Sequence, residues 1–87
     1  MTESDITATL KTVLADIAPE ADLDRVGPEE NLREELELDS MDALHVLVGL
    51  SQELDVEIPA KDYGRLTTKA DIVHYLQARV RGKQRGK

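Results

Sequence analysis

The sequence predicts an all-α fold with three main helices, one short helix and a long loop between the first two main helices. Apolar residues recur at helical spacing in three separate stretches of the chain. The alternation of period two that marks strands is essentially absent. With 87 residues the chain forms one domain with one small core, because two domains would each have too little apolar surface to bury.

The first helix is predicted from about Ser4 to Ala18, with Thr2 or Ser4 as a cap for its exposed amides and Pro19 directly after its end. The apolar residues of this stretch lie at i, i+4, i+7, i+8 and i+11, which places them on one face of a helix. They are Ile6, Leu10, Val13, Leu14 and Ile17.

The stretch from Pro19 to Asp39 is predicted to be a long loop. Gly27, Pro28 and Asn31 interrupt it among many acidic residues, so it is too broken for a long helix. Five spaced apolar residues are expected to attach this loop to the core: Leu23, Val26, Leu32, Leu36 and Leu38.

The second helix is predicted from Met41 to Leu54, and it is more apolar than one buried face requires. One stripe at helical spacing contains Val46, Leu50 and Leu54, with Ala43 and Leu47 beside it. A second apolar patch is displaced around the helix axis and consists of Met41, Leu44 and Val48. A partner can use this second patch, because the core needs only the first stripe.

A short third helix is predicted from Ala60 to Tyr63, with Gly64 stopping it. The fourth helix is predicted from about Lys69 to Arg79, with an apolar stripe of Ile72, Val73, Leu76 and Val80.

The start of the fourth helix carries a capping signal, since Thr68 and Asp71 have the spacing of a capping box. We expect residues 1–78 to form the domain. Residues 79–87 are basic and end without an apolar anchor, so they are expected to be a disordered tail.

The net charge of −7 is unevenly distributed along the chain. Residues 79–87 hold five of the 11 basic residues and no acid, so residues 1–78 combine six basic with 18 acidic residues, a formal charge of −12. Such a body repels nucleic-acid phosphates and anionic lipid, and it attracts basic protein surfaces. We therefore expect protein partners with Arg and Lys around their binding sites, and neither nucleic-acid nor membrane binding.

Several classes of site are excluded by residue content. The chain has no cysteine for a disulfide or a thiolate zinc site, and His45 and His74 lack the spacing of a local metal pair. It has no EF-hand loop pattern either. No apolar run approaches the ~18 residues of a spanning helix, and the acidic start is unlike a secretory signal. A cytoplasmic protein without a metal is expected.

No convergent set of acid, base and nucleophile is visible, so we do not expect an enzyme. The residues Ser40, Asp42 and His45 cannot form a catalytic triad. Positions five apart on a helix differ by about 140° around the axis, so Ser40 and His45 do not share a face.

The candidate site is the segment from Asp39 to Asp42, at the start of the second helix. Asp or Ser at such a position is commonly only an N-cap. If Asp39 is the cap, however, the Ser40 hydroxyl is exposed in the first turn, where the positive end of the helix dipole favours a phosphate. The second apolar patch lies just beyond it on the same helix. A phosphate site beside an apolar patch is more than a cap requires.

The run from Leu36 to Pro59 resembles the signature of acyl carrier proteins, in which an Asp-Ser-Leu or Asp-Ser-Met triplet opens the second helix. The resemblance continues through the Glu-Ile-Pro turn into the last helix and covers most of residues 4–78. It implies a four-helix up-down bundle of the acyl-carrier type. It also implies that a phosphopantetheinyl transferase, with coenzyme A and magnesium, builds a 4′-phosphopantetheine phosphodiester on Ser40, whose thiol then carries acyl groups.

The same resemblance assigns roles to neighbouring residues. Asp39 helps to present Ser40 to the transferase, and Met41 and Asp42 complete the attachment motif. The aliphatic core can open to shelter an acyl chain. The acidic residues expected to face the transferase are Glu34, Glu35, Glu37, Asp39 and Asp42. The residues expected to contact partner enzymes are Glu37, Met41, Leu44, His45 and Val48.

The chain departs from many carriers of fatty acid synthesis, which place acids along the second helix where this chain has His45, Ser51 and Gln52. The departure points to a specialised carrier in fatty acid, polyketide or related acyl metabolism. Its expected partners are a loading ligase or transferase and acyl-processing enzymes, and we expect a monomer. Two alternatives stay open: an aminoacyl or peptidyl carrier, and an unmodified helical protein-interaction module in which Ser40 is only an N-cap.

Overall fold

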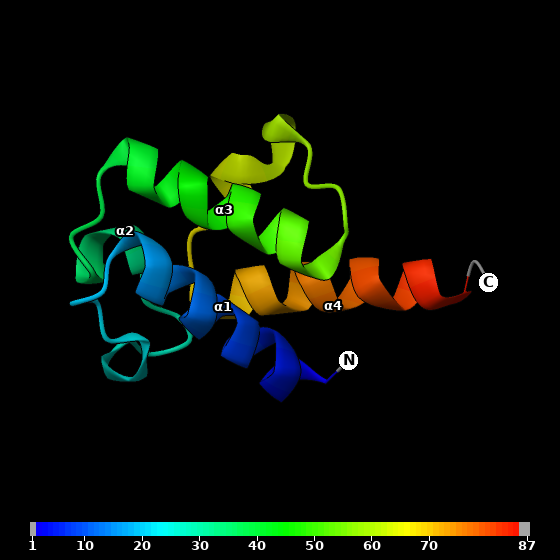
Figure 1. The fold of residues 1–87 in the computed structure, drawn as a ribbon, viewed down its shortest axis with the longest axis horizontal. Coiled ribbons are helices and arrows are strands. Elements are labelled where there is room, and N and C mark those ends of the chain that lie inside the picture. Colours follow the sequence, from blue (N-terminus) through cyan, green and yellow to red (C-terminus); the bar gives the residue numbers. More distant parts are fainter. Residues whose placement is uncertain (1, 86–87) are drawn as a thin grey trace.

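The computed structural model describes residues 2–85, with the side chains of residues 2–80. Three long helices form its frame (Figure 1): α1 (Glu3–Ile17), α3 (Ser40–Leu54) and α4 (Lys69–Arg85). Short helical turns occupy the connections: η1 (Leu23–Arg25), α2 (Leu32–Glu35) and η2 (Ala60–Arg65). Across residues 2–85 the structure has no strand, only one isolated bridge, so the predicted all-α helical bundle is confirmed.

Helix α1 begins and ends within one residue of its prediction. Thr2 is the cap: its Oγ1 accepts from the Asp5 amide at 3.2 Å, while the Asp5 carboxylate accepts from the Thr2 amide at 3.0 Å. This reciprocal pair satisfies two amides that the helix itself leaves without partners. The hydrogen bond from the Thr2 amide also lowers the pKa of Asp5 below its ordinary value.

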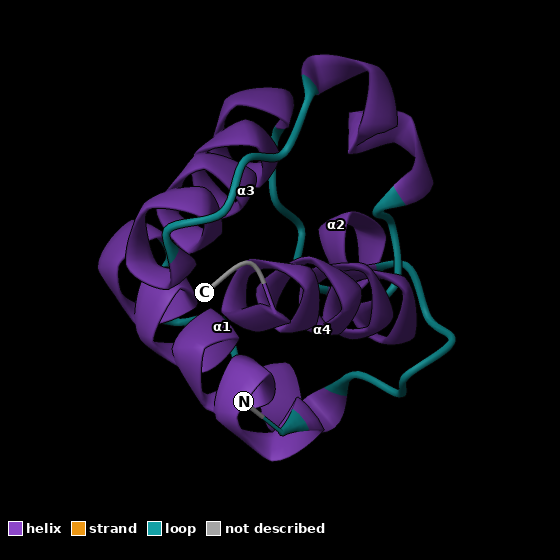
Figure 2. Cartoon of the chain, turned by 90° about the vertical axis from the view of Figure 1, so that its right-hand side faces the viewer, coloured by secondary structure: helices purple, strands orange, loops and turns teal. Residues whose placement is uncertain are grey.

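The core lies between the three long helices, and its most deeply buried side chains come from all of them: Ile6, Leu10, Leu50 and Leu76. Figure 2 looks nearly along α4 and shows α1 and α3 together on one side of it. Gly49 of α3 faces Val13 of α1 so closely that a Cβ on Gly49 would lie 2.7 Å from Val13 Cγ1. These two helices therefore owe their close approach to a missing side chain.

The connection between α1 and α3 is attached to the core as predicted, because Leu23, Val26, Leu32 and Leu38 are buried and Leu36 is half-buried. It is, however, more ordered than the predicted loop, since η1 and α2 lie within it. The side chain of Asp22 caps η1, and that of Asn31 caps α2 by accepting from the Glu34 amide at 3.0 Å. These turns span three and four residues, too few to repeat an apolar pattern in the sequence.

Two predicted helix ends are wrong. The turn η2 passes Gly64 and ends at Arg65, because glycine can adopt helical backbone angles as well as left-handed ones. Helix α4 begins as predicted, with Thr68 Oγ1 accepting from the Asp71 amide at 3.0 Å, but it continues past Arg79 to Arg85.

The extension of α4 begins with Val80, which is buried in the core, and apart from Gly82 it continues with Arg, Lys and Gln, which are good helix formers. The structure thus continues the helix through a segment that the sequence predicted to be disordered. Residues 86 and 87 of the predicted tail lie outside the described residues.

The segment before α2 is joined to the start of α4 by backbone hydrogen bonds. The Leu32 amide donates to the Thr67 carbonyl at 2.9 Å, and the Ala70 amide donates to the Pro28 carbonyl at 3.0 Å. Asn31 and Thr68 form an isolated antiparallel bridge at the same place. This junction fixes α2 against α4.

The turn η2 is joined to α4 through side chains instead. Asp62 is buried and accepts from the Tyr75 hydroxyl at 2.6 Å, while Arg79 lies 3.5 Å from the same carboxylate oxygen. The Arg79 guanidinium also stacks over the Tyr75 ring, 4.8 Å from its centre. Burial, helped by the hydrogen bond to Asp62, raises the pKa of Tyr75 above its ordinary value. We call these three residues the Asp62 cluster.

Candidate functional site

Ser40 is the first residue of α3, and its side chain is exposed. The preceding Asp39 has extended backbone and is the N-cap: its Oδ1 accepts from the Asp42 amide at 2.8 Å. The carboxylate of Asp39 therefore does the capping that a serine at this place could otherwise do. The Ser40 hydroxyl is left outside the helix, next to the positive end of the dipole of a 15-residue helix.

A residue that sequence reasoning missed lies directly beside this hydroxyl. Arg33, on α2, donates from Nη2 to Ser40 Oγ at 2.7 Å and from Nε to the Leu38 carbonyl at 3.4 Å. It is the one Lys or Arg between Arg25 and Lys61, a signal that was present in the sequence. Nothing local, however, indicated that a side chain seven positions away would reach Ser40.

The turn between α2 and α3 positions Arg33. Glu37 adopts a φ of 54°, in the left-handed region that residues other than glycine rarely occupy, and this reverses the chain. The Leu38 amide then donates back to the Arg33 carbonyl at 2.9 Å, and the buried Leu38 side chain fixes the turn to the core. Main chain and side chain together hold Arg33 close to the start of α3.

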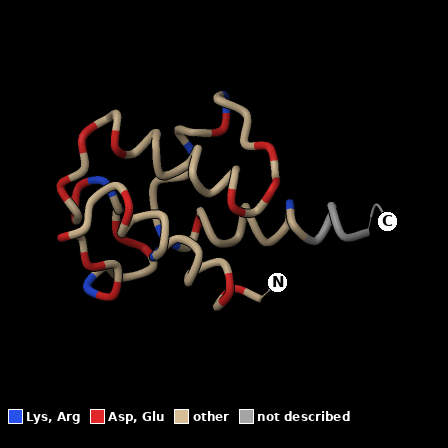
Figure 3. The backbone as a smooth tube through the Cα atoms, viewed as in Figure 1, with Lys and Arg blue, Asp and Glu red and all other residues tan. Residues whose placement is uncertain are grey.

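The surroundings of Arg33 are strongly acidic. Figure 3 shows Asp and Glu positions gathered at the end of the molecule where α2 and the start of α3 lie. The residues predicted to face a transferase are all there: Glu34, Glu35, Glu37 and Asp39 are exposed, and Asp42 is half-buried. Among the described side chains, none of these carboxylates forms an ion pair with Arg33. The guanidinium is directed to Ser40 instead.

A cavity of about 320 Å³ opens beside Ser40 and extends into the bundle. Ser40 and Arg33 line it and are exposed, so they lie at its mouth. Most of its lining is apolar and includes Leu44 and Leu47 of α3, Tyr63 of η2, Leu66 directly after η2 and Ile72 of α4. An exposed hydroxyl, a cation and an apolar chamber thus adjoin one another.

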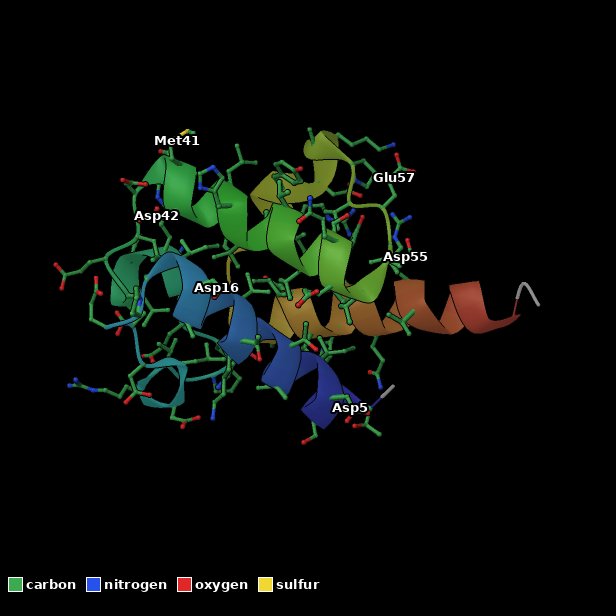
Figure 4. All side chains as sticks on the ribbon, viewed as in Figure 1. Asp5, Asp16, Met41, Asp42, Asp55 and Glu57 are labelled. Atoms are coloured by element: carbon green, nitrogen blue, oxygen red, sulfur yellow. The ribbon has the colours of Figure 1, made fainter. Side chains whose placement is uncertain are left out.

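The second apolar patch is divided by the structure. Met41 is 58 % exposed and Val48 38 % exposed, and Figure 4 shows Met41 directed away from the bundle. Leu44 is half-buried and lines the cavity, so it faces a different environment. His45 and Glu37, the other residues predicted to contact partners, are exposed.

Other kinds of site find no support in the part of the chain that the structure describes. No group of three or more His, Asp or Glu side chains there could hold a metal ion. Likewise, none of the helices among the described residues is long and apolar enough to pass through a bilayer.

The comparisons with known proteins agree with this geometry. Residues 8–76 match the family described as "Phosphopantetheine attachment site". The acyl carrier protein of Thermosynechococcus vestitus is 31 % identical to this chain over 80 residues, which covers 92 % of the chain and 98 % of that relative. A phosphopantetheine-attachment domain of this kind carries a covalently bound 4′-phosphopantetheine and is a carrier rather than a catalyst. Because the match spans most of the chain, and its fold is the helical bundle that such a domain requires, the chain belongs to the acyl carrier protein family.

Proposed function

We propose that Ser40 is the residue that carries 4′-phosphopantetheine, and that acyl groups are held as thioesters on the thiol of this arm. The observation that carries the proposal is the position of the Ser40 hydroxyl, which is exposed at the first turn of α3 while Asp39 does the capping. A buried hydroxyl, or a helix start covered by the preceding loop, would have contradicted it.

Attachment needs an accessible hydroxyl and a place for a phosphate. Ser40 Oγ attacks the phosphorus of coenzyme A that bears the pantetheine, and a new P–O bond forms. The P–O bond to the adenosine 3′,5′-bisphosphate leaving group breaks, and the hydroxyl proton passes to a base of the transferase, which also binds the magnesium. The helix dipole of α3 and the Arg33 guanidinium favour the anionic product at this position.

The cavity supports a sheltering role toward the cargo. At about 320 Å³ it lies near the lower end of the range of ligand pockets, ~300–1,000 Å³, which fits a short acyl chain better than a long one. Its apolar lining suits a hydrocarbon, and Ser40 at its mouth is where an arm would begin.

Partner enzymes are proposed to dock on the exposed part of α3 and the acidic turn before it. Met41 and Val48 offer apolar contact, with His45 and Glu37 beside them. The surrounding carboxylates favour partners with basic surfaces, namely the transferase, a loading enzyme and acyl-processing enzymes. His45, Ser51 and Gln52 stand where many fatty-acid carriers have acids, which favours specialised acyl metabolism. A cytoplasmic location is part of the same proposal.

Intact mass spectrometry tests the attachment site. After incubation with coenzyme A, magnesium and a broad-specificity transferase, we expect the wild type and the control Ser4→Ala to gain one phosphopantetheine and Ser40→Ala to gain none. Ser4 is exposed on α1 and controls for loss of a serine hydroxyl. A gain by Ser40→Ala, or none by the wild type, would overturn the proposal.

Two other functions remain distinguishable by experiment. A docking module without an arm is favoured by the exposed Met41 and Val48, and it predicts that Ser40→Ala leaves partner binding unchanged. An aminoacyl or peptidyl carrier uses the same serine, so the group released from the thioester, identified by mass spectrometry on protein from its host, separates it from an acyl carrier.

A further inference from the structure

We propose that Arg33 is the phosphate-binding residue of the prosthetic arm: it pairs with the phosphodiester on Ser40 and holds the root of the arm at the mouth of the cavity. The inference rests on the proposed function, because it needs the phosphodiester to be built on Ser40. The family relationship implies a phosphate on this chain, and the contacts around Ser40 indicate which side chain receives it.

Arg33 is already within hydrogen-bonding distance of Ser40. Arg33 Nη2 already lies 2.7 Å from Ser40 Oγ, the oxygen that becomes the bridging atom of the phosphodiester. The two non-bridging oxygens, which share the negative charge, are attached to the phosphorus bonded to that same atom. A small rotation of the guanidinium transfers its hydrogen bond from Oγ to one of them, and charge-assisted bonds of this kind are stronger than neutral ones.

The charges around Ser40 also favour a pair between Arg33 and the phosphate. Conversion adds one negative charge where Glu34, Glu35, Glu37 and Asp39 already lie, and like charges so close together oppose it. Arg33 is the one Lys or Arg between Arg25 and Lys61, and no described carboxylate forms an ion pair with it. Its charge is therefore available to the phosphate.

Hydrogen bonds to Leu38 already hold Arg33 in place. The Nε bond to the Leu38 carbonyl and the Leu38 amide bond to the Arg33 carbonyl keep the side chain over the start of α3. A guanidinium fixed in this way loses little conformational freedom when the phosphate arrives. A lysine would keep the charge but not this two-sided contact.

The experiment compares unfolding of the unmodified and modified forms of four proteins: wild type, Arg33→Gln, Arg33→Lys and Arg25→Gln. Arg25 is exposed on η1 of the same connection, so Arg25→Gln matches the change in net charge. Each variant is converted with excess transferase, and mass spectrometry confirms the conversion before denaturation. The bond from Arg33 to Leu38 is lost equally in both forms, so its contribution cancels in the difference.

For each protein the measured quantity is the ratio of the folding equilibrium constants of the modified and unmodified forms. We expect this ratio to be about two- to fivefold lower in Arg33→Gln than in the wild type, which is the range given by exposed ion pairs. Arg25→Gln should behave like wild type, Arg33→Lys should lie between, and the difference should shrink in high salt. The ³¹P resonance of the phosphodiester should also shift from its wild-type position in Arg33→Gln, but not in Arg25→Gln.

Equal effects of conversion in wild type, Arg33→Gln and Arg25→Gln, with the same ³¹P shift, would overturn the role of Arg33 while leaving the attachment site intact. Absence of any mass gain in wild type would instead overturn the proposed function. The two failures are therefore distinguishable.

Discussion

Replacing Gly49 with alanine sets helix propensity against packing. Alanine is better than glycine in a helix interior by about 1 kcal/mol, so an exposed site would gain stability. Here the new Cβ would lie 2.7 Å from Val13 Cγ1, whereas carbon atoms pack best at ~3.5–4.0 Å. Val13 is buried and β-branched, so it cannot easily turn away. Overpacking of this kind costs about 1–3 kcal/mol.

We therefore expect Gly49→Ala to lower the free energy of unfolding by about 1 kcal/mol, which corresponds to a fall in Tm of roughly 4–8 °C for a domain of this size. Urea denaturation followed by circular dichroism measures it. In a Val13→Ala background the obstructing methyl is gone, so the same change should raise stability. A stabilising Gly49→Ala in the wild-type background, or no coupling between the two positions, would refute the reasoning.

Three further predictions concern a tyrosine, the cavity and the cap. The pKa of Tyr75 is raised by burial and by its hydrogen bond to Asp62. The contribution of neutral Tyr75 to stability is therefore complete below the unfolded pKa of about 10, and it is lost as the pH rises through the folded pKa. Between pH 8 and 11 the urea midpoint of Tyr75→Phe should fall less steeply than that of the wild type. Ala43 lines the cavity, and Ala43→Leu should narrow it. In thermal scans of the acylated proteins, each methylene of the acyl chain should then stabilise the variant less than the wild type, where a buried methylene contributes at most about 0.8 kcal/mol. Asp39→Ala should lower the free energy of unfolding by about 1 kcal/mol because the N-cap is lost, and Asp39→Asn should lower it much less. If both variants lose the same fraction of the modification rate, the transferase needs the Asp39 charge rather than the cap.

The long helices could be predicted from the sequence because their apolar stripes repeat over several turns. α1 and α3 begin and end within a residue of their predictions. The caps Thr2 and Asp39 are among the candidates that the sequence offered, and Thr68 caps α4 as its spacing to Asp71 predicted. The turns η1 and α2 could not be predicted, since three or four residues do not repeat a pattern. The end of α4 was missed because the sequence gives no apolar reason for the helix to continue past Val80.

The candidate site divides in the same way between local and long-range information. The exposed position of Ser40 follows from Asp39 one residue before it, which is a local relation. The contact from Arg33 to Ser40 depends on the left-handed backbone conformation of Glu37, which a glutamate at this position does not predict. Burial of Asp62 was also unforeseen, because it depends on Tyr75 of a different helix. Side-chain contacts across a turn or between helices could therefore not be predicted from the sequence.

Two segments beside the cavity mouth, residues 28–32 and η2, are joined to α4 by different kinds of contact. The difference decides which of the two segments can be displaced. Residues 28–32 are held by paired backbone hydrogen bonds to residues 67–70, whereas η2 is held by the side chains of the Asp62 cluster. Side chains change rotamer far more readily than paired backbone separates. On the proposed function, a bulkier cargo would therefore make room by displacing η2, and the spacing between Arg33 and Ser40 would stay the same. Selection of cargo by size would then depend on Asp62, Tyr75 and Arg79, which lie away from the proposed attachment residue Ser40.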